Sequence, residues 1–127
     1  MSMQIYDDTN KSRKNYDTGW IDLSISDGKS VGSVHGYAQF RRIGKTVYLR
    51  GDVKTATNAS GFTTMAILPA GCRPSKKLVI PTMYGGNDGK VVRLWVNTIG
   101  EVALEVNRSD QTNIDWYCLD GMCFLID

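Results

Sequence analysis

The sequence predicts an all-β domain, an antiparallel β-sandwich of about eight short strands in a jelly-roll-like arrangement. Two observations predict this fold. Apolar and polar residues alternate along several short segments, which are separated by turns rich in Gly, Pro and Asn. In addition, no segment shows the period of 3.6 residues that is typical of an amphipathic helix. The strands must therefore pair with one another and bury their apolar faces in a shared core.

The clearest pair of strands spans residues 38–53 and is predicted to turn at Gly44-Lys45. A glycine at the first central position is what a two-residue type II′ hairpin turn requires. The register that this turn predicts pairs Ile43 with Thr46, Arg42 with Val47, Phe40 with Leu49 and Ala38 with Gly51.

Side chains of a strand alternate between two faces, so this hairpin has an apolar face and a polar face. The apolar face is predicted to place these residues in the core: Ala38, Phe40, Val47, Leu49 and Val53. The polar face is predicted to carry Tyr37, Gln39, Arg41, Tyr48, Arg50 and Asp52. The hairpin therefore predicts an antiparallel sheet that is buried on one side only.

The segments before and after the hairpin predict further strands. Residues 20–25 alternate, with Ile21, Leu23 and Ile25 on the apolar side. Gly- and Ser-rich residues 28–36 predict a loop, in which His35 is interpreted as a surface residue. Residues 63–68 predict a strand that ends at a corner, because two prolines and a glycine within 69–74 exclude regular structure.

The second half of the chain continues this pattern. Residues 78–84 predict a strand at a sheet edge or at a bulge, because Pro81 cannot donate to a strand ladder. Residues 91–97 alternate, with Val92, Leu94 and Val96 on one face and Arg93 and Trp95 on the other. Strands are also predicted at 102–106 and, as one strand or a pair, at 116–126, with loops at 85–89 and 107–113.

Size and charge bound the domain organisation and the partners. The 127 residues, 42% of them apolar, fit one globular domain over residues 19–127, preceded by a polar leader or linker at 1–18. A net charge of +2 is too small to indicate a nucleic-acid partner. No apolar run approaches the roughly 20 residues that a membrane-spanning helix needs, and the N-terminus lacks the apolar centre of a signal peptide. We therefore expect no membrane insertion and synthesis in a cytoplasm.

The cysteines do not predict a disulfide framework, because there are only three: Cys72, Cys118 and Cys123. If Asp120-Gly121 were a two-residue turn, Cys118 and Cys123 would face each other across two paired strands. If the segment ran on as one strand, the two thiols would lie on opposite faces. The sequence favours reduced thiols, and with a single histidine and no CxxC it predicts no metal site.

Motifs of catalysis are missing from the sequence. It contains no GxSxG elbow, phosphate loop or HExxH helix, and its acidic residues are too many and too scattered to single out a pair. We therefore predict a protein that is not an enzyme and that binds no cofactor.

Aromatic and polar side chains on the solvent-facing sides of strands predict a binding function. Saccharide rings stack on Trp or Tyr while their hydroxyls bond to charged and amide groups, and subunit interfaces are enriched in the same residues. The candidate ligand or interface residues are Tyr84, Arg93 and Trp95, beside the predicted 85–89 loop. For Trp95, a subunit interface, saccharide stacking and packing within the domain all remain open.

Four motifs, taken in order, resemble a known family. They are Thr18-Gly19-Trp20, the hairpin segment from Tyr37 to Gly51, the corner from Leu68 to Ser75, and Trp116 with Leu119 to Phe124. Over residues 18–127 this order and spacing resemble the C-terminal head domain of bacteriophage and prophage tail-fibre, baseplate and receptor-binding proteins, chiefly of Gram-positive hosts. The chain departs from the family pattern at Cys72, where Tyr is usual, and at Met122-Cys123, where Ile-Ser is usual.

The resemblance implies a β-sandwich head, commonly a homotrimer, on the tail tip or baseplate of a virion. It implies as partners other virion tail proteins and a bacterial surface polysaccharide or teichoic acid, and it assigns no ligand-contact residue. The leading interpretation is a non-catalytic receptor-binding head. The alternatives are a structural tail or baseplate module that only trimerises, and a carbohydrate-binding accessory domain of a depolymerase or hydrolase.

Overall fold

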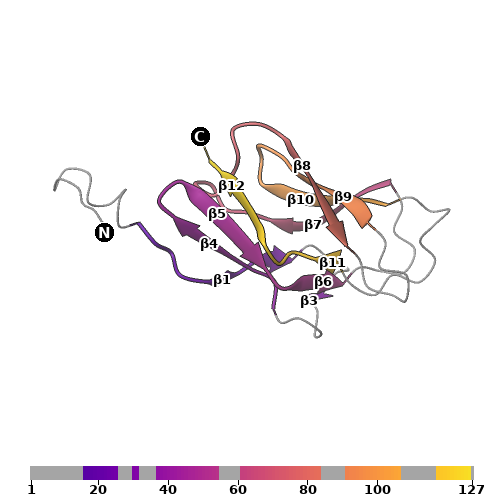
Figure 1. Ribbon diagram of the computed structural model, residues 1–127, viewed down its shortest axis with the longest axis horizontal. Helices are drawn as coiled ribbons and strands as arrows, with labels where there is room; N and C mark the ends of the chain where they lie inside the picture. Colours follow the sequence, from indigo (N-terminus) through magenta and orange to yellow (C-terminus); the bar gives the residue numbers. More distant parts are fainter. Residues whose placement is uncertain are drawn as a thin grey trace.

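Twelve strands in three antiparallel sheets make up the fold of the residues that the structure describes (Figure 1). The structure is a computed structural model, and it describes residues 16–25, 30–31, 37–54, 61–83, 91–106 and 117–126. Within these ranges all the regular secondary structure is β-strand. They contain no helix that is long and apolar enough to span a membrane. The all-β prediction is confirmed.

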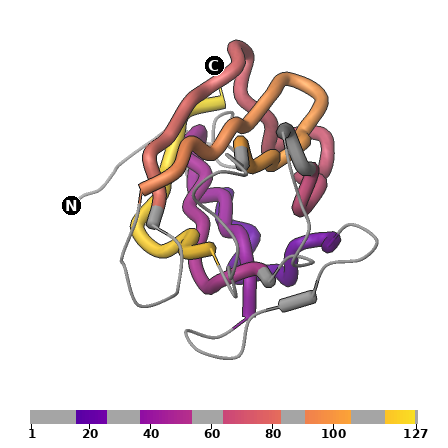
Figure 2. The backbone as a smooth tube through the Cα atoms, turned by 90° about the vertical axis from the view of Figure 1, so that its right-hand side faces the viewer, coloured from indigo at the N-terminus to yellow at the C-terminus, as the bar shows by residue number. Residues whose placement is uncertain are grey.

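Two larger sheets form the sandwich, and a smaller sheet closes one end (Figures 1 and 2). The four-stranded sheet has the order β1 (Ile21–Asp22), β4 (Gln39–Ile43), β5 (Thr46–Arg50) and β12 (Met122–Leu125). The five-stranded sheet has the order β2 (Ser24–Ile25), β7 (Gly61–Ile67), β10 (Glu101–Val106), β9 (Val91–Val96) and β8 (Leu78–Met83). The three-stranded sheet has the order β11 (Tyr117–Cys118), β6 (Asp52–Lys54) and β3 (Ser30–Val31).

The core lies between the two larger sheets. The four-stranded sheet contributes Phe40, Val47, Leu49, Met122 and Phe124. The five-stranded sheet contributes Met65, Val92, Leu94, Val96, Val102 and Leu104. Because burial of apolar side chains is the main favourable term in folding, the alternation that selects these residues also determines which strand faces point outwards.

The predicted hairpin is confirmed over β4 and β5. Ile43 pairs with Thr46, and Phe40 pairs with Leu49, as the turn at Gly44-Lys45 requires. Gly44 has φ +59°, the left-handed value that a primed hairpin turn needs at this position. All five residues predicted for the apolar face are at most 4% exposed.

The polar face of the hairpin was predicted wrongly at Asp52, which is fully buried. The cause is a bend at Gly51, which has φ +91° and separates β5 from β6. After this bend the chain leaves the four-stranded sheet, and Asp52 pairs with Cys118 in the three-stranded sheet. The alternation of the hairpin therefore does not continue past residue 50.

The first predicted strand is two short strands in different sheets. β1 pairs with β4 and β2 pairs with β7, so the chain crosses between the sheets at Leu23. Leu23 is buried and its amide donates to the Ala38 carbonyl at 2.9 Å, whereas Ile21 is 42% exposed. The prediction of one continuous strand is wrong. Ile21 lies opposite the core residue Phe40 and so on the same face of the sheet, but it stays partly exposed because β1 is the edge strand.

Of the remaining predictions, some are confirmed, one is wrong and several concern residues outside the described ranges. β8 is an edge strand of its sheet, as Pro81 predicted, and β9 alternates as predicted. The predicted loop at 28–36 contains β3, while His35 lies outside the described residues. The predicted loops at 85–89 and 107–113 also lie outside them, as do Trp116 and leader residues 1–15.

The closing segment forms two strands, but these do not pair with each other. β11 pairs with β6, and β12 pairs with β5. The three cysteines are free thiols in the structure: Cys72 is buried, Cys118 is half-buried and Cys123 is exposed. Neither predicted arrangement of Cys118 and Cys123 is present. One required β11 and β12 to pair with each other, and the other required them to form one continuous strand.

We expect the thiols to react at different rates with a disulfide reagent. Burial raises the pKa of Cys72 and of Cys118, so both have less of the reactive thiolate at neutral pH. Cys123 should therefore react first, and the other two at least about tenfold more slowly. Stopped-flow labelling of the folded protein and of a Cys123→Ser variant checks this; a fast phase that persists in the variant would contradict it.

Candidate ligand-binding surfaces

Two of the three predicted site residues lie together on the outer face of the five-stranded sheet. The neighbouring β9 residues Val92, Leu94 and Val96 point into the core, so Arg93 and Trp95 point out. Trp95 is flanked in register by Val79 on β8 and Ala103 on β10, and Arg93 is flanked by Pro81 and Glu105. Tyr84, the third predicted residue, lies outside the described residues.

Charged groups surround the Trp95 ring, which is half-buried. Lys77 Nζ lies 4.4 Å from the ring centroid and Arg93 Cζ lies 5.7 Å from it, both within cation–π range. Arg93 also forms an ion pair with Glu105 across β9 and β10. We name these residues the outer-sheet surface: Lys77, Val79, Arg93, Trp95 and Glu105. It combines an aromatic ring with hydrogen-bond donors and acceptors, as saccharide recognition requires.

A second group of aromatic and charged residues lies on the outer face of the other large sheet. Arg50 Cζ lies 3.9 Å from the centroid of the Trp20 ring, and Arg41 Cζ lies 5.9 Å from it. The polar face of the hairpin predicted that both arginines face solvent. The contact of Trp20 with these arginines was not predicted from the sequence, because it depends on the pairing of β1 with β4, which no local pattern indicates.

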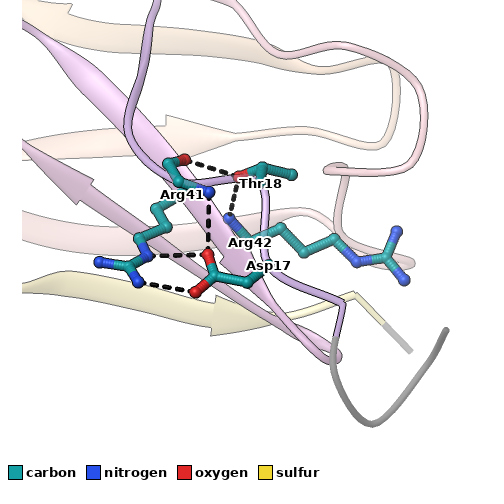
Figure 3. Close-up of polar contacts among 5 residues, drawn as sticks. Asp17, Thr18, Arg41 and Arg42 are labelled. Atoms are coloured by element: carbon teal, nitrogen blue, oxygen red, sulfur yellow. Dashed lines mark hydrogen bonds and ion pairs between the residues drawn. The ribbon is translucent and has the colours of Figure 1, made fainter. Parts of the chain in front are cut away.

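Residues 16–18, the last of the predicted leader, run along β4 (Figure 3). The amide of Thr18 donates to the Arg42 carbonyl at 3.0 Å, and the amide of Gly44 donates to the Tyr16 carbonyl at 2.8 Å. Asp17 accepts two hydrogen bonds from the Arg41 guanidinium, at 2.9 and 2.6 Å. The segment before β1 is thus joined to the hairpin through both backbone and side chains.

The Asp17 carboxyl should titrate far below its ordinary range. The hydrogen bond from Arg41 and the amide of Gly19 lower its pKa from 3.8 to about 2. Because the pKa is lower in the folded state, the stabilisation from this pair is fully present above about pH 4 and is lost as the pH falls through about 2. Carbon-detected NMR should give a midpoint near 2 that an Arg41→Gln variant moves towards 3.8. Equal midpoints in both proteins would contradict this assignment.

Among the described residues, two hollows open where the sheets meet. One, of about 460 Å³, lies between the edge strands β8 and β12, and the other, of about 340 Å³, lies between β1 and the corner after β7. Neither is lined by Arg93 or Trp95. Val79 of the outer-sheet surface does line the larger hollow, so the surface adjoins this hollow at β8, while Arg93 and Trp95 lie outside it. In the described part of the chain, no three metal-ligating side chains cluster.

Comparison with known proteins identifies the fold. No family model matches the sequence, and no curated protein does. The receptor binding protein of Listeria phage PSA has a similar structure, with 14% sequence identity and a TM-score of 0.71 over 94% of this chain and 70% of that chain. The head domain of the lactococcal phage bIL170 is also similar in structure, with 18% sequence identity and a TM-score of 0.62 over 86% of this chain and 98% of that chain. The fold that the motif resemblance implied is thereby confirmed.

Proposed function

We propose that this chain is a receptor-binding head domain of a bacteriophage tail, which recognises a saccharide on the surface of a bacterial host and catalyses no reaction. The observation that carries the proposal is the shared fold, which extends over 94% of the chain for one phage receptor binding protein and over 86% for the head domain of another. A fold alone does not determine function, so the proposal also needs a surface with suitable chemistry.

The outer-sheet surface supplies that chemistry. The indole of Trp95 offers an apolar plane for the C–H face of a sugar ring. Arg93 and Lys77 offer donors, and Glu105 offers an acceptor, within the same patch. We propose Arg93 and Trp95 as ligand contacts, with Tyr84 as a third contact.

A second role for the same surface is self-association, which is favoured by one observation. Val79 is 46% exposed and Val91 is 64% exposed, so apolar side chains flank the charged ones on this sheet. Exposed apolar residues beside Trp and Arg are typical of subunit interfaces. The proposed homotrimer, within a tail tip or baseplate alongside other virion proteins, would use such a surface. Light scattering gives the mass of the particle in solution and tests this role.

The proposal is tested by binding of fluorescently labelled protein to intact Gram-positive cells. We expect saturable binding to cells of particular strains, which mild periodate treatment of the cells abolishes and protease treatment does not. Periodate cleaves vicinal diols of saccharides, whereas protease removes surface proteins. Binding that survives periodate and is lost after protease would overturn the saccharide proposal and leave a protein receptor.

A further inference from the structure

We infer that Arg50, on the outer face of the four-stranded sheet, binds an oxyanion, that is, a phosphate or carboxylate group of a ligand. This site is separate from the outer-sheet surface, which lies on the other sheet. If the oxyanion belongs to the polymer that the head recognises, the inference rests on the proposed function. Three features of the described residues support it: the guanidinium is fixed, its charge has no acidic partner, and two of its nitrogen atoms are available.

The position of the guanidinium is fixed by a row of side chains across three strands. Asp22 on β1, Gln39 on β4 and Arg50 on β5 are neighbours in register. Arg50 Nε donates to Gln39 Oε1 at 2.9 Å, and Gln39 Nε2 donates to Asp22 Oδ1 at 2.9 Å. The guanidinium also stacks on the Trp20 ring, whose centroid lies 3.9 Å from Arg50 Cζ. A ligand that binds Arg50 therefore meets a side chain that is already ordered.

Within the described ranges the charge of Arg50 is not neutralised by an ion pair, in contrast to the charge of Arg41. Arg41 is neutralised by the two-point ion pair with Asp17. Among the described residues Arg50 bonds only to the neutral amide of Gln39 and stacks on Trp20. Asp22 reaches Arg50 only through the Gln39 amide, which accepts from Arg50 and donates to Asp22, and its carboxylate forms no ion pair with the guanidinium.

The free side of this guanidinium suits a planar or tetrahedral oxyanion. Nε is used by Gln39, which leaves the two Nη groups, and these can donate together to two oxygens of one phosphate or carboxylate. Arg50 is also solvent-exposed, so a polymer can reach it without a change in the fold. An exposed contact of this kind is weak for a single ion and gains strength when a polymer presents many anionic groups.

The test follows the Arg50 Nε–H and the Trp20 indole N–H by NMR during additions of sodium phosphate, sodium acetate or sodium chloride at matched ionic strength. We expect saturable shifts with phosphate or acetate beyond those with chloride. In Arg50→Gln the Trp20 shift should disappear, and in Arg50→Lys, which keeps the charge and loses the planar fork, it should be strongly reduced. Lys76→Gln removes an equal charge from an exposed position just before β8 and should leave the shifts unchanged.

Binding to polymers then identifies the source of the oxyanion. Poly(glycerol phosphate) carries phosphates, polygalacturonate carries carboxylates and dextran is neutral. Arg50→Gln should lower the affinity for one of the two charged polymers by about fivefold. Shifts no larger than with chloride, or polymer affinities that are equal in wild type and Arg50→Gln, overturn the inference. Oxyanion binding without any binding to cells would overturn the proposed function and leave this inference standing.

Discussion

Replacing Gly51 with alanine should destabilise the domain by roughly 3 kcal/mol or more. Gly51 has φ +91°, which side chains other than glycine rarely adopt, and a Cβ there would overlap the Tyr37 carbonyl and lie 2.9 Å from Ala38 Cα. These obstacles are backbone atoms, so no rotamer change relieves them. The backbone of Gly51 also holds the turn between β11 and β12, because its amide donates to Asp120 Oδ1 at 2.7 Å and its carbonyl accepts from the Leu119 amide at 2.8 Å.

Gly121→Ala is the matched control for this prediction. Gly121 also has a positive φ, +82°, but a Cβ there would meet no atom within 4 Å. Its replacement should therefore cost only the backbone strain, about 1 kcal/mol. Urea unfolding followed by tryptophan fluorescence measures both free energies of unfolding. Equal losses in the two variants would show that the packing against Tyr37 does not hold the bend in place.

Replacing Trp95 with alanine should weaken binding to host cells by at least about 30-fold, the equivalent of about 2 kcal/mol for a central aromatic contact. The fold should be retained, because the Trp95 ring lies on the outer face of β9 while the core residues of that strand point the other way. Cell-binding isotherms of wild type and variant give the ratio of affinities, and circular dichroism reports the fold.

Leu125→Ala removes another exposed apolar side chain, on β12 of the other sheet, and should bind cells as wild type does. Light scattering of Trp95→Ala adds a second readout. If the variant loses both cell binding and its oligomeric state, the surface is an interface between subunits. Unchanged cell binding by Trp95→Ala would remove the outer-sheet surface as the ligand site.

The hairpin shows how much of the fold could be predicted from sequence. Its register depends on a turn glycine and on alternation over ten residues, and both are local properties of the sequence. The exceptions arise where the chain passes from one sheet to another. At Leu23 and at Gly51 the alternation in the sequence continues while the pairing partner changes, so residues 21–25 form two strands in different sheets and Asp52 is buried.

In the candidate sites, too, local features could be predicted and long-range contacts could not. The outward direction of Arg93 and Trp95 follows from the alternation of β9 alone, and it was predicted. The contact of Lys77 with Trp95 and the stack of Arg50 on Trp20 join residues 18 and 30 positions apart in the sequence. Such contacts require the register between strands that are distant in sequence, which composition and spacing do not supply.

The measurement that tests the central claim most directly is the binding of labelled wild-type protein to purified wall polysaccharides from a panel of Gram-positive strains. The proposed receptor-binding head predicts a saturable isotherm with the polysaccharide of one strain or a few related strains, and no binding to the rest. A folded protein that binds none of these polysaccharides, but forms a stable oligomer by light scattering, would contradict saccharide recognition and favour a structural assembly module of the tail.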